Sequence, residues 1–146
     1  MLSKPTEYAL RALVYIAMAN YSGNRPGFKE IAKETDSPEP YMAKILQQLT
    51  RAGLVNSLKG RGGGFFFENP DEPLSLHEVI LVMEGKQFFN KCGFGFKSCD
   101  AANPCPLHNE YIVVRESFYT LVKKETIQSL AQKVMNKEAV LSRLTL

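Results

Sequence analysis

Residues 37–64 read SPEPYMAKILQQLTRAGLVNSLKGRGGG, and this stretch indicates the fold class most clearly. Ser37 suits the N-cap of a helix, Pro38 suits its first position, and Gly53 suits its end. Between them, apolar side chains recur at intervals of three and four residues, at Met42, Ile45, Leu46 and Leu49. This spacing predicts a helix over residues 38–52 with one buried face.

A shorter helix is predicted just upstream, over residues 28–35, so the two form a helix-turn-helix. Another face of the second helix presents Tyr41, Lys44 and Gln48. A glutamine amide can read adenine, and a lysine can read guanine or contact a phosphate in the major groove. An exposed polar face can equally be only solvated, so the helix pair alone does not decide between the two.

The residues that follow predict a β-hairpin, because β-prone residues 54–58 and 65–67 flank the run Lys59-Gly-Arg-Gly-Gly-Gly64. A tip with two cations among four glycines lets the backbone approach DNA, and Arg61 can enter a minor groove. A nucleotide-binding loop is the alternative, but the run lacks the Lys-Ser/Thr and the helix that such loops need. We therefore predict a wing whose DNA contacts are Lys59, Arg61, Gly62 and Gly63.

The formal net charge is only +3 over 146 residues, but cations are concentrated in the first half. Residues 1–68 carry nine Lys and Arg against six Asp and Glu, whereas residues 69–146 carry nine of each. A locally positive half favours a polyanionic partner, although so small an excess also fits a solvated basic surface. At 45% hydrophobic residues, the chain can bury one core.

Helices are also predicted outside this region, which makes the fold class mainly α with a small β-hairpin. Residues 6–20 predict a buried first helix, and Ser75 caps a helix that ends at Gly85, with His77 on its surface. A long helix is predicted from Pro106, continuing to the end of the chain with a break near Asn136. Its apolar residues have heptad spacing suited to a partner helix, although packing within one chain is the alternative: Leu107, Tyr111, Val114, Phe118 and Leu121.

The predicted organisation has four parts along the chain. Residues 1–70 form a winged helix-turn-helix domain, and residues 71–88 form a linking helix. Residues 89–108 form a cysteine loop, and residues 106–146 form a dimerisation helix with a C-terminal tail. The start of the chain does not look like a signal peptide, and no long apolar run predicts a membrane span, so we expect a cytoplasmic protein.

All three cysteines lie in the predicted loop, as Cys92-x6-Cys99-x5-Cys105, and His108 follows. Three thiolates and an imidazole are suitable ligands for a soft metal or an iron–sulfur cluster. Phe94 and Phe96 can exclude water from such a centre. Inert thiols or a disulfide are the alternatives, but clustered cytosolic thiols are more often metal-binding or redox-active.

In combination these motifs resemble the Rrf-type winged-helix regulators, whose members include the iron–sulfur cluster regulator IscR and the nitric-oxide-sensitive repressor NsrR. The resemblance rests on Thr6-Glu-Tyr-Ala-Leu-Arg-Ala-Leu-Val-Tyr-Ile-Ala17, on the helix pair and on the glycine-rich wing. It implies a homodimer on double-stranded operator DNA. By this match the DNA contacts are Ser37, Pro38, Tyr41, Lys44 and Arg61, while Gln48 joins them from the helix face.

The resemblance also implies a [2Fe-2S] or [4Fe-4S] cluster on Cys92, Cys99 and Cys105. IscR-like members take the fourth ligand from a histidine shortly after the third cysteine, here His108. NsrR-like members take it from an acid on the first helix of the other subunit, here Glu7. Glu7 can instead simply pair with Arg11 on the surface. The first interval of six residues departs from the five of IscR-like members, so the cluster type does not carry over.

The leading interpretation is a transcription regulator, by expectation a repressor, that senses redox state, nitric oxide or iron–sulfur status through the cluster. The first alternative keeps DNA binding but makes the cysteines a cluster-free thiol switch, or gives the protein no cofactor. A metal-dependent or thiol enzyme is a further alternative. We do not expect an enzyme, because no acid–base pair or nucleophile–histidine arrangement stands out beside the cysteines.

Overall fold

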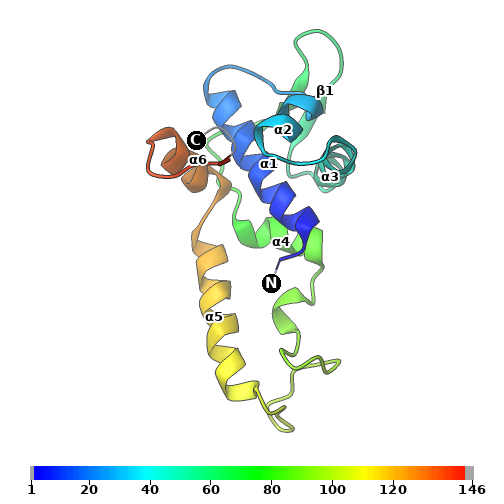
Figure 1. The fold of residues 1–146 in the computed structure, drawn as a ribbon, viewed down its shortest axis with the longest axis vertical. Coiled ribbons are helices and arrows are strands. Elements are labelled where there is room, and N and C mark those ends of the chain that lie inside the picture. Colours follow the sequence, from blue (N-terminus) through cyan, green and yellow to red (C-terminus); the bar gives the residue numbers. More distant parts are fainter. Residues whose placement is uncertain (1, 144–146) are drawn as a thin grey trace.

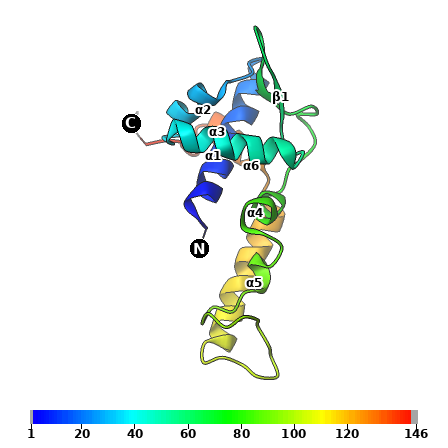
Figure 2. The same ribbon diagram turned by 90° about the vertical axis from the view of Figure 1, so that its right-hand side faces the viewer.

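The computed structural model describes residues 2–143, so Met1 and the last three residues of the predicted tail lie outside it. It is mainly helical with one two-stranded antiparallel hairpin, which confirms the predicted fold class. The hairpin lies at one end of the molecule, and the cysteine loop lies at the other (Figure 1). Helix α5 (His108–Lys124) forms most of an arm that projects from the helical body toward the cysteine loop (Figure 2).

Helix α1 (Lys4–Tyr21) is the central element of the body and matches the predicted first helix. It contacts four other helices, namely α2 (Phe28–Glu34), α3 (Glu39–Arg51), α4 (Leu76–Glu84) and α6 (Ile127–Met135), and also the hairpin. Several of its side chains have no exposed surface, including Ala9, Ala12, Leu13 and Ile16. Because four helices and the hairpin contact α1, a displacement of α1 reaches all of them.

Helices α2 (Phe28–Glu34) and α3 (Glu39–Arg51) form the predicted helix pair. The predicted apolar stripe of α3 is buried, with 3% exposure or less at Met42, Ile45, Leu46 and Leu49. The predicted cap is wrong, because Pro38 occupies the N-cap position. The Ser37 hydroxyl donates instead to the Thr35 carbonyl, at 3.3 Å, and so braces the turn between the two helices.

The hairpin consists of β1 (Asn56–Leu58) and β2 (Gly64–Phe66), paired in the register Asn56 to Phe66 and Leu58 to Gly64. The Phe65 amide donates to the Pro26 carbonyl at 2.9 Å, which fastens β2 to the loop before α2. The wing is therefore attached to the body on the side of that loop.

Helix α4 (Leu76–Glu84) begins at the predicted cap, where the Ser75 hydroxyl accepts from the Glu78 amide at 3.2 Å. A short 3-10 helix, η1 (Phe88–Asn90), follows it. The prediction that His77 is only a surface residue is wrong. Its ring stacks on Phe89 with centroids 5.0 Å apart and meets the edge of Tyr119 at 5.3 Å, because η1 and α5 fold onto α4.

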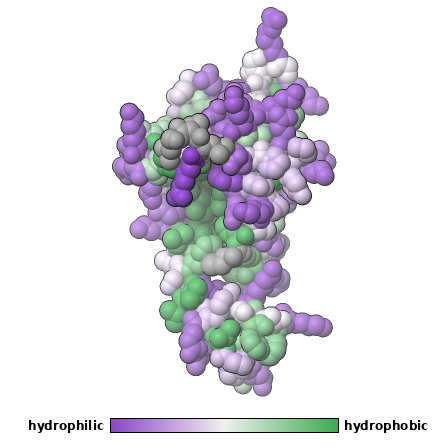
Figure 3. All heavy atoms as spheres, in the orientation of Figure 1, coloured by the Kyte–Doolittle hydropathy of each residue, from purple (hydrophilic) through white to green (hydrophobic). Residues whose placement is uncertain are grey.

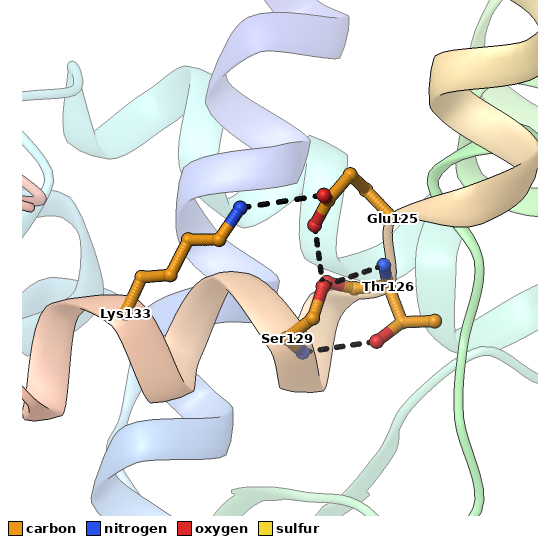
Figure 4. A network of polar contacts seen from close by, with 4 residues as sticks. All are labelled: Glu125, Thr126, Ser129 and Lys133. Atoms are coloured by element: carbon orange, nitrogen blue, oxygen red, sulfur yellow. Dashed lines mark hydrogen bonds and ion pairs between the residues drawn. The ribbon is translucent and has the colours of Figure 1, made fainter.

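The predicted continuous C-terminal helix is also wrong, because α5 ends at Lys124 and α6 (Ile127–Met135) starts after a sharp turn. Figure 4 shows the contacts that make this turn. Thr126 and Ser129 cap α6 reciprocally, each amide donating to the other hydroxyl at 2.9 Å. The Glu125 carboxylate accepts from the Ser129 hydroxyl and pairs with Lys133. The predicted break near Asn136 is confirmed, since Asn136 is the C-cap of α6.

Candidate DNA-binding surface and cysteine loop

The outer face of α3 carries the predicted base-reading side chains. Tyr41 is 57% exposed, and Lys44 is exposed one turn further along the same face. Pro38 is exposed at the start of the helix, whereas Ser37 is half-buried. Gln48 is exposed but engaged, because its amide donates to the Val82 carbonyl in α4 at 3.3 Å. Tyr41 and Lys44 are therefore available to a groove, and Gln48 is held toward the neighbouring helix.

The wing tip exposes both predicted cations, Lys59 and Arg61, together with Gly62. Its glycines differ in what they do. A Cβ at Gly62 would meet no described atom within 4 Å, so this glycine leaves room for a ligand. A Cβ at Gly63 would fall on the Leu58 carbonyl, and one at Gly64 would fall on the Arg25 carbonyl. Gly63 is therefore required by the wing's own turn, and Gly64 by the packing of the wing against the loop before α2.

Arg25 is a cation beside the wing that the sequence analysis missed. It is exposed, and its guanidinium lies over the Phe66 ring, 3.9 Å from the centroid. An arginine next to a glycine-rich hairpin in space carries no local sequence signal, because the loop and the strand are forty residues apart. The stacking holds its charge at the outer surface of β2.

The cysteine loop brings its four predicted ligands together in two pairs. The Cys99 sulfur lies 3.5 Å from Nδ1 of His108, and the Cys92 and Cys105 thiols interact with each other. Cys105 also interacts electrostatically with Cys99, so the two pairs adjoin. All three cysteines are free and half-buried. Within residues 2–143, no three His, Cys, Asp or Glu side chains are arranged closely enough to hold a metal ion. The donors therefore fit a cluster in kind and in place along one loop, but are not assembled around one point.

Cys92 and Cys105 have thiols of different acidity. Backbone amides, first that of Phe94 at 3.4 Å from the sulfur, lower the pKa of Cys92 because they stabilise the thiolate. Burial raises the pKa of Cys105, and its interaction with Cys92 adds to the effect. Cys92 is therefore the more readily ionised thiol of this pair.

An aromatic cavity of about 250 Å³ lies against Cys92, between the end of α4, η1 and α5. Its walls include Phe88, Phe89, Tyr111 and Phe118, and its charged lining residues are Glu84, Lys91 and Arg115. Gly93 packs so closely on the Tyr111 ring that a Cβ would overlap it. Phe94 and Phe96 contact each other but are more than half exposed, so in a single chain they do not cover the loop.

The two candidates for a fourth ligand lie in different surroundings. His108 is only 8% exposed and belongs to the cysteine loop. Glu7 lies on α1 and pairs with Lys4 at 3.1 Å. The alternative that Glu7 pairs with Arg11 is not seen, since the Arg11 guanidinium lies over the Tyr8 ring at 5.2 Å. The contact with Cys99 places His108 among the thiols of its own chain. Glu7 as a ligand supplied by the other subunit stays a prediction.

The arm also exposes much of the predicted heptad seam. Leu107, at the N-cap of α5, and Val114 and Leu121 within the helix repeat at seven-residue intervals and are 45%, 52% and 51% exposed. Tyr111 and Phe118, the other members of the seam, are half-buried. Figure 3 shows apolar side chains at the surface of this lower part of the molecule.

No helix within residues 2–143 has the length and apolar character that a membrane crossing requires.

Comparisons with known proteins agree with this geometry. The Rrf2 family profile, described as an iron-dependent transcriptional regulator, matches residues 2–133. Protein aau3 of Rhizobium meliloti is 33% identical over 132 residues, 90% of this chain and 84% of that protein. The regulator IscR of Cereibacter sphaeroides is 37% identical over 84 residues, 57% of this chain and 54% of IscR.

Among solved structures, CymR (YrzC), the global cysteine regulator of B. subtilis, has the same fold. Its TM-score is 0.72 at 22% identity, over 90% of this chain and 96% of that one. The family resemblance seen in the sequence is therefore confirmed, and the chain belongs to the Rrf2 family of transcriptional regulators.

Proposed function

We propose that this protein is a homodimeric repressor that binds operator DNA through α3 and the wing. The observation that carries the proposal is that exposed Tyr41 and Lys44 on α3 accompany exposed Lys59 and Arg61 at the wing tip. The helix suits a major groove, and the wing cations suit the stronger negative potential of an adjacent minor groove. Pro38, Gly62 and Gly63 would approach the sugar-phosphate backbone of the DNA, and Ser37 would support the start of α3.

The dimer would form along α5. Leu107, Val114 and Leu121 are about half exposed along α5, and exposure of apolar side chains to water is unfavourable in free energy. Their seven-residue spacing suits packing against a second copy of the same helix. Two copies related by a twofold axis would present two α3 helices to a pseudo-palindromic site. The protein would then act in the cytoplasm, where its operator lies.

The cysteine loop would be the sensor, with Cys92, Cys99, Cys105 and His108 holding an iron–sulfur cluster. Support comes from the two donor pairs and from the amides around the Cys92 sulfur. The IscR relative and the family description, iron-dependent regulator, point the same way. When bound, a cluster would supply a centre that responds to redox state, nitric oxide or iron–sulfur status. Gathering the two pairs at one point would require the loop to change shape.

A cluster-free thiol switch is the second candidate, and the interacting pair Cys92 and Cys105 favours it. An oxidant would remove two electrons and two protons from these thiols to form a disulfide. The structural likeness to CymR, titled a cysteine regulator, is compatible with thiol-based sensing.

Protein purified without oxygen separates the two candidates. Cluster sensing predicts brown protein, iron and sulfide bound per chain, and an operator affinity that changes when the cluster is removed. A thiol switch predicts colourless protein after anaerobic reconstitution and a disulfide in the peptide map after mild oxidation. If affinity for DNA selected from a random pool is the same in every state, the sensory function is refuted while DNA binding stands.

The fourth ligand is tested by paired variants. His108→Ala should bleach or destabilise the cluster, because the imidazole already lies beside the Cys99 sulfur. Glu7→Ala should leave the visible spectrum unchanged, and His77→Ala is the control for loss of the other histidine. If Glu7→Ala bleaches the protein and His108→Ala is silent, the ligand assignment reverses.

A further inference from the structure

We propose that Glu84 is a positioning residue that couples the cysteine loop to the recognition helix α3. The inference rests on the proposed function, since it assigns the physical link between the sensor and the DNA-binding surface. These two regions lie toward opposite ends of the molecule, so their coupling needs a connected set of contacts (Figure 1).

The last turn of α4 is where these contacts meet. The Glu84 carboxylate accepts from the Ser3 amide at 2.9 Å and from the Thr6 hydroxyl at 2.6 Å. Two residues earlier, the Val82 carbonyl accepts from the Gln48 amide of α3 at 3.3 Å. The same turn therefore holds the start of α1 and the outer part of α3.

This turn also borders the sensor. Glu84 lines the cavity that Cys92 lines, and only η1 and short connections separate α4 from Cys92 along the chain. A change in loop shape that moves the cavity wall would therefore act on the end of α4. From there it has two routes, through Thr6 into α1 and through Gln48 into α3.

The link to Thr6 is stronger than an ordinary surface contact. Thr6 is fully buried, and its hydroxyl reaches an ionised acceptor at short distance. Partial burial works to raise the pKa of Glu84, but hydrogen bonds from Ser3 and Thr6 outweigh it and hold the pKa below 4.5. The carboxylate is thus charged at neutral pH and binds the first turn of α1 through two hydrogen bonds.

Two variants change this link with little change in shape. Glu84→Gln removes the charge that strengthens both hydrogen bonds but keeps one amide oxygen as a weaker acceptor. Thr6→Val removes the donating hydroxyl within the same volume and so breaks the link to α1. Glu78→Gln is the matched control, since it removes an exposed carboxylate from the same helix. Each full-length protein is prepared reduced, oxidised with diamide, and reconstituted anaerobically with ferrous iron and sulfide.

The readout is the ratio of operator affinities between preparations, together with hydrogen exchange over residues 39–51 without DNA. Allosteric couplings typically change affinity by about 5- to 150-fold. We expect such a ratio in the wild type and in Glu78→Gln. In Thr6→Val it should fall to within about twofold of unity, with the state-dependent change in exchange confined to residues 86–107. In Glu84→Gln it should fall part of the way, because the acceptor remains but its charge is gone.

Unchanged ratios in both variants would overturn the coupling while leaving the sensory function intact. A wild-type ratio of one in all preparations would refute the sensory function and the coupling with it. Variants that raise exchange throughout α1 in every state, yet keep the wild-type ratio, would show that the link serves stability alone.

Discussion

Replacing Gly64 by Ala should detach the wing from the body. Gly64 has φ +140°, in a region that residues with a side chain rarely adopt. A Cβ there would fall on the Arg25 carbonyl and close to that of Pro26. Both obstacles are backbone atoms, so no side-chain rotation relieves the overlap. The strand must move away, and the hydrogen bond from the Phe65 amide to Pro26 is lost.

The expected cost has two parts. A strained backbone conformation costs about 1–3 kcal/mol. Loss of one backbone hydrogen bond costs about 1 kcal/mol. Together, Gly64→Ala should lower the free energy of unfolding by roughly 2–4 kcal/mol. Gly62→Ala is the control, because φ is +77° there but no described atom lies within 4 Å of the added methyl. It should cost only about 1–2 kcal/mol.

Urea denaturation followed by circular dichroism gives both free energies, and hydrogen exchange at the Phe65 amide reports wing attachment directly. Gly64→Ala should show rapid exchange at this amide and weakened operator binding, whereas Gly62→Ala should keep the amide protected. Equal free energies for the two variants, with Phe65 protected in both, would refute the argument that Gly64 is required for packing against the Arg25 loop.

Three further predictions follow from the DNA surface, the thiols and Glu84. Arg61→Ala should weaken binding on all sequences and flatten its salt dependence, while Lys44→Ala should relax base preference at defined positions by about 1–3 kcal/mol; quantitative binding to selected and scrambled duplexes separates them. At neutral pH iodoacetamide should label Cys92 before Cys105, as mass spectrometry of tryptic peptides will show, and the reverse order would contradict the lowered pKa of Cys92. Because the pKa of Glu84 is held below its ordinary 4.5, the stability it adds is complete above that pH and is lost as pH falls through the folded-state pKa. Thermal melts of wild type and Glu84→Gln should therefore converge in acid, and a constant difference would contradict the shift.

The elements predicted well from sequence are those whose signals are local. The α3 stripe and the glycine-rich hairpin are set by spacing over a few residues, so their positions hold to within a few residues in the structure. The end of α5 was missed because the α6 cap uses Ser129, not the Glu or Gln that the usual capping pattern requires. The surroundings of His77 were missed because Phe89 and Tyr119 reach it only through tertiary folding.

The candidate site divides in the same way. Its donor types and their order along the loop are evident from sequence, whereas their pairing is not, because it depends on how α5 returns toward η1. Gln48 illustrates the point most clearly. Its place on the exposed face of α3 predicts a base contact, yet the structure engages its amide with the Val82 carbonyl. Gln48 is therefore a candidate both for the predicted base contact and for the proposed coupling. Its role can be assigned only by measuring operator affinity and, separately, how that affinity changes with the state of the cysteine loop.

The two-pair arrangement of the loop has an energetic consequence for sensing. A ligand shifts an equilibrium only by the difference between its affinities for the two states. A fully assembled ligand set would bind a cluster without a change in the loop, and α4 would then not be displaced. Because the described donors are not assembled around one point, gathering them would require the loop to move against the wall it shares with Glu84. Part of the binding free energy would drive that movement, so the proposed cluster would bind less tightly than at a preformed site. The same movement would make a response at α3 physically possible.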